Sequence, residues 1–329
     1  MTATAPTITP QSPDPHASLR RKPRLGERLT ELALRTVALT SIAAIVLILA
    51  FIAREALPVF AGGTVGESGT SFDLLASERL ADGTEQFLWR PVSQPPTYNI
   101  VPLVVGSLKV TLVALFIAAP LGIAAAIYVS ELAGKKQREL IKPTIELLAG
   151  VPSVVIGFFA LIVLTTWVQQ VFGTEHRLNA LTAGIGLALA VCPVIFTISE
   201  DALQAVPHTY RTAALALGSD RVQMIVRVVV PAALPGILAS LVLGFGRAIG
   251  ETMIVLLASG NAAIVSGSVG VSTRTITATI AQELGEVVVG SDHYHVLFAL
   301  GTVLFASTFV LNFAGERVIH GLRKKLGTA

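Results

Sequence analysis

Residues 208 to 251 read HTYRTAALALGSDRVQMIVRVVVPAALPGILASLVLGFGRAIGE, and this stretch decides how the rest of the chain is interpreted. Its first half is too polar to lie in lipid, because it carries four charged side chains: Arg211, Asp220, Arg221 and Arg227. Its second half is apolar except for one cation and one anion, Arg247 and Glu251. A charge at the centre of a bilayer costs about 2.5–3.5 kcal/mol, so membrane helices rarely keep one without a use. A polar segment joined directly to such a helix indicates a membrane protein whose helices are moved by a force applied on one side of the membrane.

Composition places the whole chain in a membrane. Of its 329 residues, 53% are apolar and 14% are charged, whereas a soluble protein has about a quarter charged residues. No G-x-x-x-x-G-K-[ST] loop occurs, so the chain does not hydrolyse nucleotides by that route. The single cysteine, Cys192, excludes an intramolecular disulfide and a cysteine-based metal site. His293 and His295 have no third ligand nearby in the sequence, so we assign no metal and no catalytic residue.

Six apolar segments meet the length of about 20 residues that a membrane-spanning helix requires. They cover residues 33–53, 101–129, 149–172, 179–198, 233–259 and 294–316. We therefore predict an all-α integral membrane protein with a six-helix transmembrane domain over residues 33–316. Residues 1–32 are expected to form a disordered basic tail, and residues 317–329 a second short tail.

The distribution of Lys and Arg residues predicts the orientation of the chain. With the N-terminus inside, sixteen of these residues fall on the inner side of the membrane. The outer side receives five: Arg54, Arg79, Arg90, Arg177 and Arg274. Both termini are therefore expected in the cytoplasm, in a chain that crosses the membrane several times.

Two connections on the predicted outer side are long. Residues 54–100 are polar and rich in Gly, Ser and Pro, so we expect an external insertion there. Residues 260–293 contain a predicted helix near 273–286, with Ser272 or Thr273 as its cap. The sequence leaves open whether this helix dips into the membrane or lies on it.

The inner connection, residues 199–232, contains another predicted helix. Residues 209–217 are rich in alanine, and Gly218 is placed to end the helix. A helix this short is not stable alone in water, so it needs a partner surface. From the residues alone, docking to another protein and packing on its own bundle are both open.

A gapped motif in this loop carries a resemblance. It consists of Thr212-Ala213-Ala214, Gly218 and Val228-x-Val230-Pro231. This pattern resembles the loop motif of ABC importer permeases, E-A-A-x3-G-x9-I-x-L-P, with Thr in place of Glu and Val in place of Ile and Leu. The resemblance implies the bundle of a type I importer permease. It also implies that the loop is a coupling element that docks in a groove of an ATP-hydrolysing subunit.

Two further segments are similar to the permeases of phosphate importers. They are the run from Gly246 to Met253 with Ser259-Gly260-Asn261, and the run from Arg274 to Ala281. They resemble the C-type subunit more than the A-type. The resemblance implies an A-type permease as partner, two cytoplasmic ATPase subunits and an external phosphate-binding protein. The resemblance implies that the partner binds ATP, so we expect no cofactor and no enzymatic activity on this chain. We also expect no nucleic-acid partner.

Arg247 and Glu251 are the predicted centre of the substrate path, and Thr252 follows them in the similar segment. Residues four apart share one face of a helix, so the two charges are expected to reach each other. Arg247 would lie about 21 Å into the span, at 1.5 Å per residue. An arginine matches phosphate oxygens bidentately, so the pair predicts a transient anion site; a static ion pair that fixes helix packing is the other interpretation.

Two other functions agree with the residues. An ABC permease for another oxyanion, such as molybdate or sulfate, would keep the loop and change the site. A secondary anion transporter would work without any ATPase.

Overall fold

A computed structural model describes residues 25–61, 74–75, 77–79, 85–94 and 96–326 of the chain. Within this part, six helical stretches are long and apolar enough to cross a membrane, which confirms the predicted all-α class and the six spans. Most of the predicted disordered tail, residues 1–24, lies outside the described residues. The chain divides into two units, residues 1–51 and residues 52–329.

The first unit is described from the start of α1 (Leu25–Phe60), a helix that continues into the second unit. Residues 25–32, expected to belong to the tail, are helical. Glu31 and Arg35, one turn apart, form an ion pair of 2.6 Å that favours this conformation. The helix also runs to Phe60, so the predicted insertion begins several residues later than position 54.

The second unit contains a bundle of helices interrupted by π-helical turns. Its first part comprises α2 (Val101–Ile127), η3 (Tyr128–Leu132), α3 (Lys135–Ala149), α4 (Ser153–Phe159), η4 (Ala160–Leu164), α5 (Thr165–Phe172) and α6 (Ala180–Gln204). Its second part comprises α7 (His208–Ala216), α8 (Arg221–Met224), η5 (Ile225–Val229), α9 (Val230–Ile249), α10 (Met253–Ala258), α11 (Ile276–Glu283) and α12 (Asp292–Leu326).

Helix α6 lies at the centre of this bundle, with α2 and α9 packed along it. It is rich in small residues, and among the candidate spans it has the largest buried share. Leu187, Val191 and Ile195 of α6 are fully buried against Ala114 of α2 and Ile254 of α10. Small side chains let membrane helices approach closely, so the composition of α6 explains its central position.

The helices extend beyond several of the predicted boundaries. Helix α6 runs to Gln204 and the next span begins at Arg221, so the predicted loop of 199–232 shrinks to about half its length. The charged Glu200 does not end α6, because Lys142 and Arg138 pair with it. The predicted C-terminal tail is helical through Leu326 as part of α12.

The insertion contains two short antiparallel hairpins. β1 (Glu78–Arg79) pairs with β2 (Glu85–Gln86), and β3 (Trp89–Arg90) pairs with β4 (Thr97–Tyr98). In the second hairpin Trp89 lies opposite Tyr98, and both side chains are buried. They join a core with Ala56, Leu103 and Val296, so the hairpin is packed onto the bundle.

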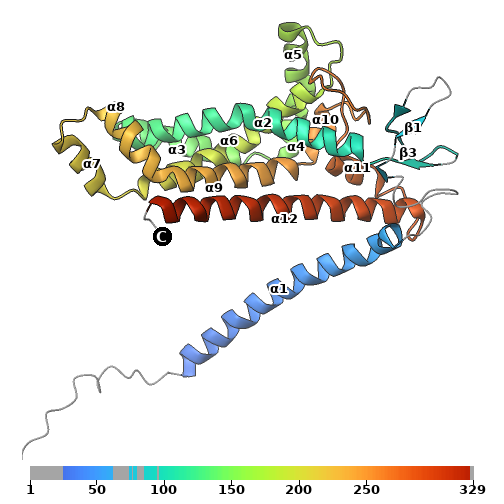
Figure 1. Cartoon of the computed structure of the whole chain (residues 1–329), viewed down its shortest axis with the longest axis horizontal. Coiled ribbons are helices and arrows are strands. Elements are labelled where there is room, and N and C mark those ends of the chain that lie inside the picture. Colours follow the sequence, from blue (N-terminus) through green and yellow to red (C-terminus); the bar gives the residue numbers. More distant parts are fainter. Residues whose placement is uncertain (1–24, 62–73, 76, 80–84, 95, 327–329) are drawn as a thin grey trace, which may run out of the picture. The chain divides into compact units, whose positions relative to one another are not determined.

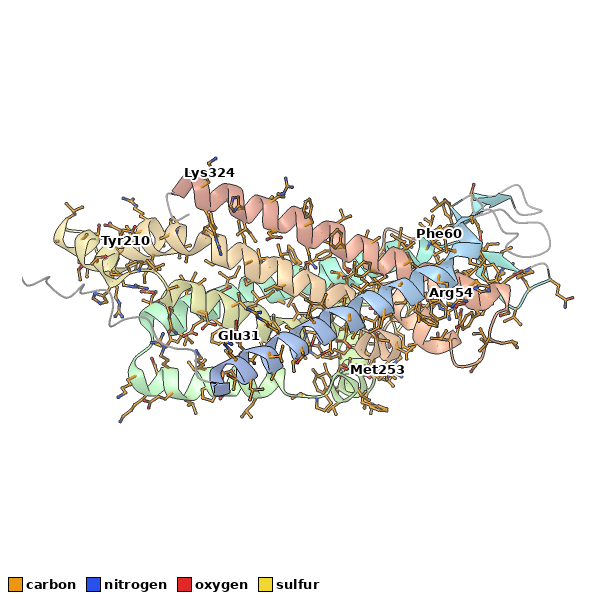
Figure 2. All side chains as sticks on the ribbon, turned by 90° about the horizontal axis from the view of Figure 1, so that it is seen from below. Glu31, Arg54, Phe60, Tyr210, Met253 and Lys324 are labelled. Atoms are coloured by element: carbon orange, nitrogen blue, oxygen red, sulfur yellow. The ribbon has the colours of Figure 1, made fainter. Side chains whose placement is uncertain are left out.

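The two functional ends of the second unit lie far apart. In Figure 1, α7 and α8 lie at one end, together with the C-terminal end of α12, and β1, β3 and α11 lie at the opposite end. The labelled side chains agree, with Tyr210 and Lys324 toward one end and Arg54 and Phe60 at the other (Figure 2). Any action of α7 on the α11 end must therefore pass through the membrane helices.

Candidate functional site

The fifth span breaks where the predicted substrate residues lie. Helix α9 ends at Ile249 and α10 begins at Met253, although the sequence predicted one span over 233–259. Arg247 lies in the last turn of α9, whereas Glu251 lies beyond its end. The two residues do not share a helical face, and they form no salt bridge in the described part of the chain. The predicted ion pair is therefore wrong.

A distant hydroxyl group accounts for this break. Thr277 of α11 donates a hydrogen bond of 2.8 Å to the backbone carbonyl of Glu251. The carboxylate of Glu251 accepts a hydrogen bond of 3.2 Å from the backbone N–H of Thr252. Both the carbonyl and the carboxylate of Glu251 therefore accept hydrogen bonds from this chain. Gly250 is the C-cap of α9. Glu251 remains half-buried, while Arg247 is exposed on the surface of this chain.

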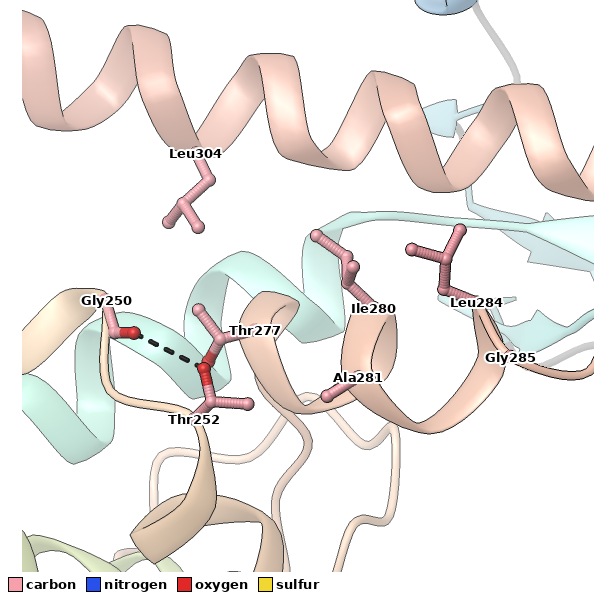
Figure 3. A pocket seen from close by; sticks show the side chains of 8 residues that line it. All are labelled: Gly250, Thr252, Thr277, Ile280, Ala281, Leu284, Gly285 and Leu304. Carbon is pink, nitrogen blue, oxygen red and sulfur yellow. Dashed lines mark hydrogen bonds between the residues drawn. The ribbon is translucent and has the colours of Figure 1, made fainter. Parts of the chain in front are cut away.

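Thr252 lies in the wall of a groove between the end of α9, α11 and α12. Its hydroxyl donates a hydrogen bond of 3.4 Å to the carbonyl of Gly250 (Figure 3). The groove has a volume of about 570 Å³, and its lining residues are Gly250, Thr252, Thr277, Ile280, Ala281, Leu284, Gly285 and Leu304. Apart from the two threonine hydroxyls, the lining side chains are apolar.

The connection before α11 enters between the membrane helices. The N–H of Ile276 donates a hydrogen bond of 3.0 Å to the hydroxyl of Ser107 in α2. Gly106 lies so close to this connection that an added Cβ atom would be 2.1 Å from the carbonyl oxygen of Arg274. Ser107 is six residues into α2, about 9 Å along its axis. The connection thus packs against α2, and the predicted helix forms as α11, with Thr275 as its cap in place of Ser272 or Thr273.

Glu283 at the end of α11 binds partners from three other segments of the chain. It pairs with Arg274 at 2.7 Å and with His293 at 3.3 Å. It also accepts hydrogen bonds of 3.1 and 3.3 Å from the indole N–H of Trp89. Tyr98 stacks on His293 with ring centroids 5.5 Å apart. This cluster fastens the insertion to α11, and the sequence reasoning missed it because its members are far apart in the chain.

Burial and two nearby carboxylates change the acidity of Tyr98. Desolvation, reinforced by Asp292 and Glu283, raises the pKa of the Tyr98 phenol to about 12. The phenol therefore stays neutral over the whole physiological pH range.

The opposite end of the bundle carries the predicted coupling segment. The expected helix over 209–217 forms as α7, and Gly218 ends it with a φ of +84°, a conformation that glycine adopts without strain. Thr212 and Ala213 are exposed, whereas Ala214 is buried against Met224 and its neighbours. Pro231 lies, also exposed, in the first turn of α9 rather than on α7.

A second buried carboxylate supports the region beside α7. Glu200 accepts a hydrogen bond of 2.8 Å from Lys142 and one of 3.2 Å from Arg138, and Gln204 contacts it as well. The hydrogen bond to Glu200 raises the pKa of the Lys142 ammonium group. These contacts tie α3 to the end of α6.

A bundle of membrane-spanning helices, with an exposed short helix at one end and a charged break in one span, defines a membrane permease. The chain belongs to the family described as binding-protein-dependent transport system inner membrane component, whose model matches residues 118–326.

Individual comparisons agree with this family. A probable ABC transporter permease protein of Bacillus subtilis, YqgH, is 39% identical over 68% of this chain and 72% of its own length. The phosphate transport system permease protein PstC of Mesorhizobium japonicum is 32% identical over 83% of this chain and 85% of its own length. An inward-facing structure of the MetNI methionine ABC transporter superposes with a TM-score of 0.52 at 16% identity, covering 68% of this chain and 94% of that one. The fold is that of a type I ABC importer permease.

Proposed function

We propose that this chain is one of two membrane subunits of an ATP-driven importer of inorganic phosphate. The observation that carries the proposal is the 32% identity, over 83% of the chain, to a phosphate transport system permease protein. Related proteins from Mycobacterium tuberculosis and Xylella fastidiosa, each 31% identical, carry the same description. The chain itself forms the path, and hydrolysis of ATP takes place on another subunit.

Arg247, Glu251 and Thr252 form the substrate path in this proposal. Arg247 is exposed on a span whose other residues are mostly apolar, and a cation facing lipid is unfavourable. The exposed face of α9 must therefore meet a second subunit or water. A guanidinium group there can bind two phosphate oxygens at once. Thr252 adds a hydroxyl donor at the break, and Glu251 lies close enough in the chain to limit how tightly an anion is held.

The coupling segment supplies the contact with the ATPase. The exposed side chains of α7 include Thr212 and Ala213, and Leu217, directly after the helix, is 88% exposed. They offer a small, partly apolar surface for a partner, with Gly218 and Pro231 at its edges. The complete importer contains an A-type permease, two ATPase subunits and an external phosphate-binding protein. Both termini and α7 lie in the cytoplasm, and closure of the ATPase pair moves α7 and tilts the helices around Arg247.

Replacement of Arg247 tests the substrate path. In proteoliposomes that contain the complete importer, Arg247→Ala should lower ATP-driven uptake of labelled phosphate about 10- to 100-fold, because one charge-assisted contact is lost. Arg54→Ala is the matched control, since Arg54 is also exposed but lies at the end of the bundle that carries the insertion. Its uptake should equal that of the wild type.

Two outcomes would reject the proposal. Near-normal uptake by a folded and assembled Arg247→Ala complex would remove Arg247 from the path. Uptake by the wild-type chain without ATP or an ATPase would show a secondary transporter. ATP-driven uptake of labelled molybdate or sulfate, without uptake of labelled phosphate, would change the substrate and keep the class of transporter.

A further inference from the structure

A buried ion pair connects α7 to the end of α2. Arg211 of α7 binds both carboxylate oxygens of Glu131, with Nη2–Oε1 at 2.7 Å and Nε–Oε2 at 3.2 Å. The Glu131 side chain is 5% exposed and that of Arg211 is 15% exposed. Two parallel contacts fix the relative orientation of the two groups as well as their distance. Neither residue was singled out by the sequence for this contact.

The same guanidinium group also holds the end of α6. Arg211 donates from Nη1 to the carbonyl of Val206 at 2.6 Å and from Nη2 to the carbonyl of Leu203 at 2.8 Å. Carbonyls at the C-terminal end of a helix lack helical partners and carry partial negative charge, so a cation binds well there. Arg221 of α8 then donates to the backbone carbonyl of Glu131 at 2.6 Å. The ends of α2 and α6 thereby meet α7 and α8 at one point.

Apolar packing holds α7 only weakly. Ala214 is the buried residue of this nine-residue helix, while Leu215 and Leu217 are exposed. A helix of this length gains little stability by itself, and Gly218 after it has open space around its Cα. Glu131, in contrast, lies in η3, a π-helical turn of the kind that often marks functional positions. The contacts of Arg211 therefore supply a buried polar connection between α7 and the bundle.

We propose that the Arg211–Glu131 pair is the positioning contact through which a displacement of α7 moves the ends of α2 and α6. This inference rests on the proposed function, because it requires α7 to be the segment that the ATPase moves. Without the pair, the short segments on either side of α7 would absorb the displacement. The ATPase would then still bind and hydrolyse ATP, but its cycle would no longer move the path.

The test measures phosphate transported per ATP hydrolysed by the complete importer in proteoliposomes. Glu131→Gln keeps the shape of the side chain, Arg211→Gln leaves a shorter polar side chain, and each removes one charge of the pair. Each should retain the copurifying ATPase and lower the ratio about tenfold, within the usual range for coupling between sites. The double variant should be no worse than Arg211→Gln alone, because that substitution already removes the ion pair. Arg211→Lys keeps the charge and should give an intermediate ratio.

Arg138→Gln is the control, because its partner Glu200 keeps Lys142. It should leave the ratio at the wild-type value. The inference is overturned if Arg211→Gln keeps the wild-type ratio, including the case in which uptake and hydrolysis fall in proportion. It is also overturned if the ATPase no longer copurifies, because the pair would then serve assembly. If Arg211→Gln is not inserted, a wild-type ratio in Glu131→Gln overturns it equally. A wild type that transports without ATP would reject the proposed function instead.

Discussion

At the scale of single residues, Gly106 controls how closely the connection before α11 approaches α2. Gly106→Ala should destabilise the protein by about 1–3 kcal/mol, because its Cβ atom would overlap the carbonyl of Arg274 and crowd the hydroxyl of Thr273. Thermal unfolding of the detergent-solubilised protein measures this loss. Gly267→Ala, with no atom within 4 Å of the added Cβ, should be neutral. Equal melting temperatures for the two variants would contradict the close contact.

The residues of the candidate path show what the sequence could predict and what it could not. Arg247 and Glu251 could be recognised, because charges in an apolar run are rare. Their geometry could not be predicted, since the bond that holds the Glu251 carbonyl comes from Thr277, which is 26 positions away in the chain. The helical spacing of four residues describes only an unbroken helix. The proposed role of the two residues stays a prediction.

At the scale of elements, the hairpin of β3 and β4 is closed over the Glu283 cluster, and Tyr98 reports on this closure. The ordinary pKa of the phenol is 10.0, and in the folded protein it rises to about 12. The folded state therefore binds this proton more tightly than the unfolded state does. The contribution to stability is fully present below pH 10 and is lost as the pH rises toward 12.

An alkaline titration checks this pH dependence. The ultraviolet difference spectrum of tyrosinate should contain a component that titrates near pH 12 in the wild type and is absent from Tyr98→Phe. The other three of the four tyrosines in the chain supply the common background. If the component that Tyr98→Phe removes titrates near pH 10 in the wild type, the hairpin does not bury Tyr98.

Local elements were predicted well, and their mutual contacts were not. The alanine-rich pattern and Gly218 were sufficient for α7, and α11 was also found. The cap of α11 was misplaced because the hydroxyl oxygen of Thr275, not that of Ser272, accepts a hydrogen bond from the backbone N–H of Ala278 in the first turn. The attachment of the insertion through Trp89 depends on pairing over 194 positions, which no local pattern contains.

At the scale of the whole molecule, the orientation of the spans can be tested with single cysteines. Cys192 is the only cysteine of the chain, so Cys192→Ser gives a background without thiols. In it, Val92→Cys and Leu217→Cys place thiols at sites that are 93% and 88% exposed, at opposite ends of the bundle. A membrane-impermeant maleimide should label position 92 in intact cells and position 217 only after permeabilisation. Labelling of position 217 in intact cells would contradict the proposed cytoplasmic location of α7.

The exposed position of Arg247 has a consequence for the life of the protein in the cell. A newly made copy that has not assembled with a second subunit exposes the positive charge of Arg247 to the lipid acyl chains. In the proposed importer a second membrane subunit covers this charge, so a cell that makes only this chain should accumulate less of it than a cell that makes both subunits.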